Sequence, residues 1–378
     1  MNNYCISDIH GNAERFALLV SALNLKHPNK DYKLHILGDL FDRGDDSEEI
    51  LTIIYNNYEN INVLKGNHEA LFMAFMEDPT NNYINWQMNY SYSTIMSFGY
   101  KHLSMLADKY ADFTEFQIMN EYYKKLVQVE RRLKYLTGTS YGANRFLNTY
   151  VNQIKTTVSS RDVRNAGADF RQSIASSFRK KKAGFLNAFE KLFYAYLIDD
   201  FCGVYEYFDS LDKCALVGDD YLLVHSGFVS RNKNPNVKDS CGGYLYNECE
   251  TVEDLIFQNE YPMIWARRYE QSTGKPVAPD RFDGRVVVFG HTTTNSFNEN
   301  KSTQTAFNYD KQGRLASVGI DGGNYNKFQG LLNCVCLEDL SQIVVKGTAQ
   351  KGTLAIENIP YVAPSQLHQP TQPTEVNF

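Results

Sequence analysis

The chain has 378 residues, 43% of them hydrophobic and 13% aromatic, which suits one large domain or two ordinary ones with a sizeable core. Seven cysteines with no CxxC pair predict free thiols in a reducing compartment, and they argue against a disulfide framework or a thiolate zinc site. The net charge of -6 is uneven, because residues 121–200 hold 15 Lys and Arg against 7 Asp and Glu. No run approaches the roughly 20 apolar residues of a membrane span, and the N-terminus lacks a secretory signal. We therefore expect a cytoplasmic protein with no membrane partner.

Short apolar runs that end in polar clusters recur along the chain, and they predict buried strands that are each followed by a loop. In chain order they are NYCISDIHG, KLHILGDLFDRG, INVLKGNHE, YLLVHSG and RVVVFGHT. Between the first three, NAERFALLVSALNL and SEEILTIIYNNY carry apolar residues at the three- and four-residue spacing of amphipathic helices. This alternation of strands and helices is typical of a layered α/β fold.

The long segment between the third and fourth strands is predicted to be helical. Apolar residues from Met119 to Leu136 alternate spacings of three and four, and similar patterns recur in NRFLNTYVNQIKTTV and GFLNAFEKLFYAYLIDD. We therefore expect a helical insertion over residues 78–200, set into a discontinuous α/β domain of residues 1–77 and 201–350.

Two further segments stand out by composition. The basic stretch FRKKK, Phe178–Lys182, is either a solvated face or a basic rim that attracts a phosphorylated substrate or a protein partner. Nucleic acid is not expected as a partner, since no RNA- or DNA-binding motif accompanies this charge. The Pro- and Gln-rich tail over residues 364–378 is expected to be disordered.

Polar side chains follow all five predicted strands. They are Asp8 and His10 after the first, Asp39, Asp42 and Arg43 after the second, Asn67 and His68 after the third, His225 after the fourth and His291 after the fifth. A single cluster of this kind often only forms a turn. Five clusters at the carboxyl ends of strands instead indicate a binding site, because ligands of open α/β sheets bind at that edge. Mixed carboxylate, amide and imidazole ligands suit Mn, Fe or Zn. So many ligands suit two ions that share a bridging carboxylate.

The motifs DIHG, GDLFDRG, GNHE, LLVHSG and VFGHT, in this order, resemble those of the calcineurin-like metallophosphoesterases. GDLFDRG with GNHE looks like the phosphoprotein phosphatase branch, particularly its bacterial and phage members, and MIWARR is also similar to that group. The resemblance covers about residues 1–75 and 215–335 and leaves out the helical insertion. It implies a four-layer αββα sandwich as the catalytic domain.

The resemblance also implies a role for each residue at the strand ends. Asp8, His10 and Asp39 would hold the first ion, and Asp39, Asn67, His225 and His291 the second, with Asp39 bridging. His68 would be the general acid, oriented by Asp42, which would raise its pKa. Arg43, Arg267 and Asn67 would contact the substrate phosphate. The chain departs from the family pattern at Ser7, where Gly is frequent, and at Lys65, where Arg is usual.

The activity that this resemblance implies is hydrolysis of phosphomonoesters. A metal-bound hydroxide would attack phosphorus in line, with Mn²⁺ as the expected metal in vitro and Fe or Zn as alternatives. The expected substrates are phosphoproteins, phosphorylated on Ser, Thr or Tyr, or small phosphoesters. A symmetrical dinucleoside tetraphosphatase or another nucleotide hydrolase is the alternative, although that group tends to end its asparagine motif in Asp where this chain has Glu69. A second alternative is an inactive scaffold that binds partners through the insertion, but the ligand set is complete.

Overall fold

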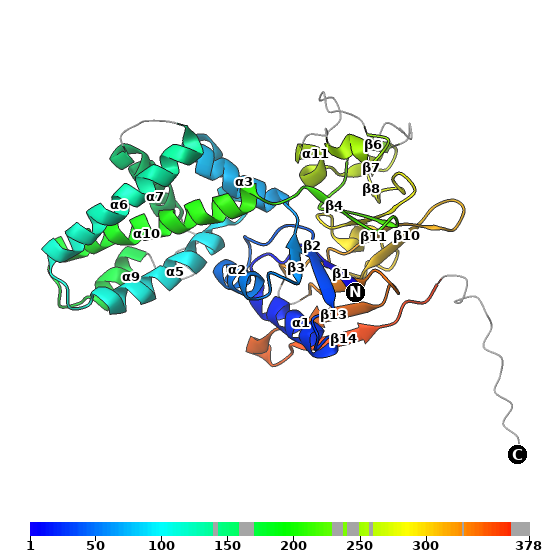
Figure 1. Ribbon diagram of the computed structural model, residues 1–378, viewed down its shortest axis with the longest axis horizontal. Coiled ribbons are helices and arrows are strands. Elements are labelled where there is room, and N and C mark those ends of the chain that lie inside the picture. The colour runs from blue at the N-terminus through cyan, green and yellow to red at the C-terminus, as the bar shows by residue number, and fades with distance from the viewer. Residues whose placement is uncertain are drawn as a thin grey trace, which may run out of the picture.

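The computed structural model consists of a pair of β-sheets on one side and a bundle of long helices on the other (Figure 1). The structure describes residues 1–138, 143–158, 170–228, 237–239, 249–256, 260–326 and 329–363. The tail for which disorder is predicted, residues 364–378, lies outside this part of the chain. Among the described residues, no helix has the length and apolar character needed to cross a membrane.

The first sheet has six strands in the order β14-β13-β12-β1-β2-β3. Their bounds are β1 Asn2–Ile6, β2 Tyr32–Ile36, β3 Ile61–Val63, β12 Leu332–Cys336, β13 Gln342–Lys346 and β14 Ala355–Ile359. Strands β1, β2 and β3 are parallel, whereas β12, β13 and β14 continue the sheet in antiparallel pairs. The three parallel strands therefore deliver the loops that follow them to one edge of the sheet.

The second sheet has five strands in the order β10-β11-β9-β5-β4. Their bounds are β4 Cys214–Val217, β5 Tyr221–Val224, β9 Val286–Phe289, β10 Ala306–Tyr309 and β11 Leu315–Gly319. Strands β5, β9 and β11 are parallel, so the loops after β5 and β9 also share an edge. A separate small sheet pairs β6 Val237–Asp239, β7 Arg268–Glu270 and β8 Pro276–Val277.

The two large sheets pack face to face over an apolar layer. Its buried residues are Cys5, Leu37, Leu64, Leu223, Val286, Val288, Val318, Ile320, Val335 and Leu337. Helices α1 (Ala13–Lys26) and α2 (Ser47–Asn56) pack on the outer face of the first sheet. The outer face of the second sheet contacts the six-residue α11 (Glu260–Trp265) and the 3₁₀ turn η1 (Glu253–Ile256). The predicted αββα sandwich is therefore confirmed, with a thin outer layer on the second sheet.

The helical part begins directly after β3. Its helices are α3 Asn67–Glu77, α4 Pro79–Met88, α5 Ser91–Tyr110, α6 Glu115–Thr137, α7 Ala143–Val158, α9 Phe170–Ser177 and α10 Ala183–Asp209. Outside this part, two short 3₁₀ turns occur, η2 Thr294–Ser296 and η3 Ala349–Lys351. The helix that the apolar spacing predicts over Met119–Leu136 lies within α6. Thr114 and Gln117 form a capping box at the start of α6, and Gly138 ends it in the left-handed conformation.

The proposed end of the insertion at residue 200 lies inside α10, which continues to Asp209. The helix continues because its apolar face still has a partner there. Phe201 and Phe208 are fully buried, and both rings pack against Phe72 of α3. One continuous core connects the first sheet, α1, α2 and the helical bundle. The bundle therefore shares its core with the α/β domain.

Candidate metal centre

The site lies where the loops after β1, β2, β3, β5 and β9 meet. The backbone there is unusual, because six non-glycine residues adopt the left-handed conformation, with φ between 48° and 69°: Asp8, His10, Asp39, Asp42, Arg43 and His291. This conformation is uncommon for residues that carry a Cβ, and it is found where a site requires a fixed side-chain direction. All six are among the residues predicted from the strand ends.

The third strand leads into the site through the N-terminus of α3. Gly66 precedes the helix, and a Cβ at this position would lie 2.4 Å from Oδ1 of Asp39, so only glycine fits. The carboxylate of Glu69 accepts hydrogen bonds from the backbone N–H groups of Gly66, Asp39 and Leu40, each at 2.8 Å. One buried side chain therefore ties the loop after β2 to the start of α3.

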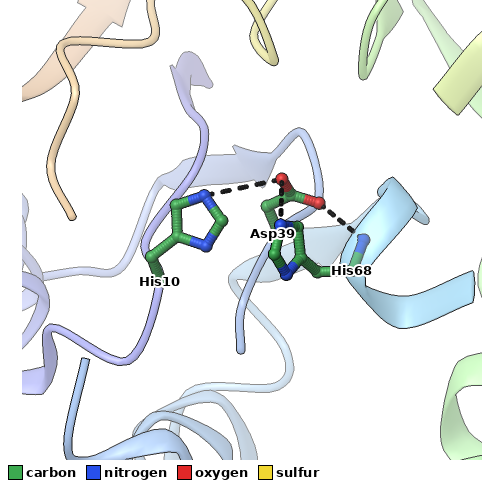
Figure 2. A group of neighbouring side chains, drawn as sticks. All are labelled: His10, Asp39 and His68. Carbon is green, nitrogen blue, oxygen red and sulfur yellow. Dashed lines mark hydrogen bonds and ion pairs between the residues drawn. The ribbon is translucent and has the colours of Figure 1, made fainter. Parts of the chain in front are cut away.

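Asp39 lies between two groups of imidazoles. Its Oδ2 is 3.6 Å from Nε2 of His10, and its Oδ1 is 3.5 Å from Nε2 of His225. Figure 2 shows the rings of His10 and His68, which both face Oδ2 of this carboxylate. Two sets of potential metal ligands share the carboxylate, His10–Asp39–His68 and Asp39–His225–His291, and all are buried. Asp39 thus has the geometry of a bridging carboxylate.

The orientation of the histidines fits two metal ions. Nδ1 of His10 contacts the carbonyl oxygen of Phe41 at 2.9 Å, and Nδ1 of His225 contacts that of Leu37 at 2.5 Å. The other ring nitrogen of each therefore faces the site, as is usual for a metal-ligating histidine. Nε2 of His291 is buried without a hydrogen-bond partner among the described residues. An orphaned buried nitrogen of this kind is what a bound cation would satisfy.

The remaining predicted ligands join the same group. Asp8 Oδ1 lies 3.8 Å from Nε2 of His10, and Asp8 Oδ2 accepts a hydrogen bond from the N–H of His291 at 2.9 Å. Asn67 Oδ1 lies 2.9 Å from Nε2 of His225. The structure therefore brings all six predicted ligands together, although their coordination to metal remains a prediction.

The predicted general acid forms a close pair with its predicted partner. Nδ1 of His68 lies 2.7 Å from Oδ2 of Asp42, and both side chains are fully buried. Nε2 of His68 lies 4.0 Å from Asp39 Oδ2, so this nitrogen faces the bridging carboxylate. The geometry alone would also allow His68 to be a ligand, and its role as proton donor remains a prediction.

Both arginines that the resemblance assigns to phosphate binding reach the centre. The Arg43 guanidinium lies 2.9 Å from Nε2 of His10 and 3.2 Å from Nε2 of His68. Arg267 donates to the carbonyl oxygen of His291 at 3.3 Å. Lys65 instead pairs with Glu260 at 3.0 Å, so a carboxylate already offsets its charge.

A family model described as calcineurin-like phosphoesterase matches residues 1–159. This match covers less than half of the chain, and it supports the resemblance to the calcineurin-like metallophosphoesterases that the motifs indicate. Over 74 residues the chain is 39% identical to a symmetrical bis(5'-nucleosyl)-tetraphosphatase of Buchnera aphidicola. The aligned segment covers 20% of this chain and 26% of that protein. Over another 74-residue alignment it is 28% identical to a zinc-dependent endopolyphosphatase of Saccharomyces cerevisiae. That alignment covers 20% of this chain and 22% of the endopolyphosphatase. The match thus spans about a quarter of each of these proteins.

The crystal structure of a candidate diadenosine tetraphosphatase shows a likeness at 12% sequence identity and a TM-score of 0.41, over 92% of this chain and 94% of that one. The metallophosphoesterase family implies divalent metal ions, which agrees with the histidine and aspartate groups described above. The branch of phosphoprotein phosphatases, by contrast, stays a prediction.

Burial controls the protonation of this metallophosphoesterase site. Desolvation, followed by repulsion from Asp8, raises the pKa of Asp39 well above its usual value, and desolvation raises that of Asp42 to about 7. The pKa values of His10, His68 and His291 are well below the ordinary histidine value, again mainly through burial. The pKa of His68 is thus lowered overall, by burial and by the nearby Arg43 and His225, whereas the sequence predicted a raised value through Asp42.

Two buried residues of the site, Asp321 and Glu69, were not predicted as site residues. Asp321 follows β11, and burial, together with repulsion from Asp8, raises its pKa well above the usual value. Its signal in the sequence, VGIDGG, is the same apolar run followed by an acid that marks the other strand ends. In the sequence, Glu69 serves only to distinguish one branch of the family. Two of its three backbone contacts are with groups 29 and 30 residues away, which no local pattern indicates.

Proposed function

We propose that this metallophosphoesterase hydrolyses phosphoanhydride bonds of a nucleoside polyphosphate, with symmetrical dinucleoside tetraphosphates as the substrate class. The observation that carries the proposal is the Asp39 carboxylate, whose two oxygens face different groups of histidines at the strand ends. Two relatives add to it, because the tetraphosphatase and the endopolyphosphatase are both named for chains of phosphates. This was the alternative expectation from the sequence, and it has more support than phosphoprotein hydrolysis.

The residues that would hold two divalent ions are those that the structure gathers around Asp39. Asp8, His10 and Asp39 would hold one ion, and Asp39, Asn67, His225 and His291 the other. When bound, such ions supply Lewis acidity toward phosphoryl oxygens and activate water at neutral pH. Nitrogen and oxygen donors of this mixture suit Mn, Zn or Fe.

The chain's own cations and its buried histidine would complete the reaction. Arg43 lies beside both His10 and His68, so its guanidinium can hold phosphoryl oxygens where negative charge increases during the attack. Arg267 reaches the same edge from the loop before β7. In its imidazolium form, with a proton on each ring nitrogen, His68 would donate the Nε2 proton to the leaving oxygen while Asp42 accepts the Nδ1–H and holds the ring. Because burial lowers the pKa of His68 in the free protein, the negative charge of the bound phosphates would have to favour this form. Hydrolysis of diadenosine tetraphosphate by one water would then give two molecules of ADP.

A phosphoprotein phosphatase is the second candidate, and Arg43 favours it. The GDLFDRG motif places this arginine within reach of the centre, and Glu69 follows His68 where the tetraphosphatase group tends to have Asp.

A protein partner bound through the insertion is a further proposal. The basic stretch 178–182 joins α9 to α10 at the end of the bundle away from the sheets (Figure 1). A direct role as a rim of the metal site therefore has no support from this position.

The test compares substrates side by side. Purified protein with Mn²⁺ or Zn²⁺ is given diadenosine tetraphosphate, inorganic tripolyphosphate and a panel of phosphopeptides. We expect two ADP from each molecule of the dinucleotide and a much lower kcat/KM for the phosphopeptides. Chromatography of the nucleotides and phosphate release measure the two activities.

An Asp39→Asn variant serves as the control for contaminating phosphatases and should be inactive on every substrate. Faster turnover of phosphopeptides than of the dinucleotide would replace the proposal by the second candidate. Inactivity of the wild-type protein with every metal would leave only the scaffold interpretation.

A further inference from the structure

Asp42, the partner of His68, also binds two side chains from the helical insertion. Trp86 of α4 donates its indole N–H to Asp42, with Nε1 at 3.0 Å from Oδ2 and 3.2 Å from Oδ1. Thr94 of α5 donates its hydroxyl to Oδ1 at 2.7 Å. Asp42, His68, Trp86 and Thr94 are all fully buried. Water therefore cannot replace either contact without a rearrangement of the core.

The direction of these hydrogen bonds determines how His68 is held. The indole N–H and the Thr94 hydroxyl both donate to Asp42, and donors of this kind favour its ionised form, whose oxygens can only accept. With Asp42 ionised, Oδ2 also accepts from the ring of His68, so Nδ1 carries a proton and Nε2 faces the centre. Thr94 in addition accepts the backbone N–H of Asp42 at 3.0 Å, so it holds both the main chain and the side chain.

The two supporting residues are themselves firmly placed. The indole of Trp86 packs edge-on against Phe72, with ring centroids 5.4 Å apart, and in a tilted arrangement against Phe75, with centroids 4.8 Å apart. Ser47 of α2 lies 3.2 Å from the hydroxyl of Thr94. Because the hydrogen of Thr94 points to Asp42, Ser47 is the donor in this contact. The support therefore extends into both the insertion and the α/β domain.

We propose that Trp86 and Thr94 are positioning residues for the proton-donating pair, so that the helical insertion is part of the catalytic apparatus. They act through Asp42 on the orientation of His68 and touch neither substrate nor metal ligands. The catalytic part of this inference rests on the proposed function, since it assumes that His68 protonates a leaving oxygen. The orientation of His68 itself can be measured without any substrate.

The first experiment observes His68 by NMR in the metal-free protein labelled with ¹⁵N-histidine. The proton on Nδ1 gives a downfield signal that His68→Asn removes, which assigns it. Trp86→Phe and Thr94→Val should broaden this signal or speed its exchange with water at least about tenfold, because a loosened pair opens more often. Thr94→Ser restores the hydroxyl and should restore the signal.

The second experiment measures turnover of the best substrate of the wild-type protein. Trp86→Phe and Thr94→Val should lower kcat roughly tenfold, within the contribution of general acid catalysis, with KM and metal content little changed. The same changes made in a His68→Asn background should cost almost nothing further, because their effect passes through His68. A merely structural role would instead give independent, multiplying losses.

Tyr83→Phe is the matched control. Tyr83 is on α4 with Trp86, and its buried hydroxyl has no hydrogen-bond partner among the described residues. This variant should leave the His68 signal and kcat unchanged. An unaltered His68 signal in both Trp86→Phe and Thr94→Val would overturn the proposal. If Trp86→Phe does not fold, the comparison of Thr94→Val with Thr94→Ser decides the question. An inactive wild-type protein would refute the proposed function, while the NMR result would still decide the positioning.

Discussion

Asp39 presents its two carboxylate oxygens to two different groups of nitrogen ligands, and its position is fixed from several directions. Its N–H is bound by Glu69, and its Oδ1 accepts the N–H of His68 at 3.0 Å. Its φ of 58° holds the side chain in a direction that a residue in an ordinary conformation would not reach. A carboxylate held in this way loses little conformational freedom when it binds a cation.

Two substitutions separate the ligands from the proton donor. Asp39→Asn removes the charge shared by both groups, and we expect the protein to lose most of its bound metal. His68→Asn should retain its metal and lose about 100-fold or more in turnover, within the range of general acid catalysis. Inductively coupled plasma mass spectrometry of the purified variants measures the metal. An empty site in His68→Asn would show that His68 is a ligand, as its distance to Asp39 also permits.

Metal binding should release protons at neutral pH. Because desolvation raises the pKa of Asp39 well above its usual value in the metal-free protein, a cation competes with a proton for this carboxylate up to a higher pH than for an ordinary aspartate. His10 and His291 need lose no proton, because burial lowers their pKa values well below the ordinary histidine value. We expect proton release on metal binding and weaker metal binding as the pH falls. Calorimetry in two buffers of different ionisation enthalpy counts the protons. A count of zero would contradict the raised pKa.

Most residues that face the candidate metal centre could be predicted from the sequence because they follow an apolar run. Asp8, Asn67 and His291 were found in this way, although they lie far apart in the chain, whereas Asp321 was missed despite the same pattern. The residues that support them could not be found, since their contacts depend on packing. Trp86 looks like an ordinary apolar residue of a helix, and only the fold brings it to Asp42. The pKa of His68 was misjudged for the same reason, because its complete burial was unknown.

At the scale of the element, the first turn of α3 both supplies site residues and fixes a neighbouring loop. Asn67 and His68 face the centre, while Glu69, in the same turn, binds backbone groups of the loop after β2. Oε2 of Glu69 accepts two N–H groups and Oε1 accepts a third. The boundary between strand loop and helix is therefore held by charge-assisted hydrogen bonds, which are stronger than neutral ones.

Glu69→Gln should destabilise both the fold and the metal site. The amide group of glutamine would bring an N–H toward a backbone N–H, so at least one buried donor would lose its acceptor, at a cost of about 1–3 kcal/mol. Thermal denaturation should show a lower Tm, and metal titration a weaker Kd. The exposed Glu49→Gln on α2 is the matched control and should change neither. Wild-type metal affinity in Glu69→Gln would mean that the loop after β2 holds its shape without this carboxylate.

For the whole molecule, the important feature is that the helical bundle and the first sheet share one core. The sequence predicted the helices of the bundle as an insertion over residues 78–200, because the family motifs stop soon after His68. The apolar face of α10 extends past residue 200. Its last two turns pack on the helix that carries Asn67 and His68. Stability of the bundle and geometry of the site should therefore change together.

Phe201→Ala tests this coupling. The ring of Phe201 is fully buried and contacts Phe72 and Phe98, so its loss should cost about 3–5 kcal/mol of unfolding free energy. Circular dichroism at the helical band and the fluorescence of Trp265, observed in a Trp86→Phe background, report on the bundle and on the site respectively. We expect both probes to give one transition at the same lowered Tm, as two-state unfolding of a shared core requires. Phe116→Ala, at a position where the side chain is 74% exposed, should leave the Tm unchanged. Two separate transitions would instead show that the bundle is an independent domain.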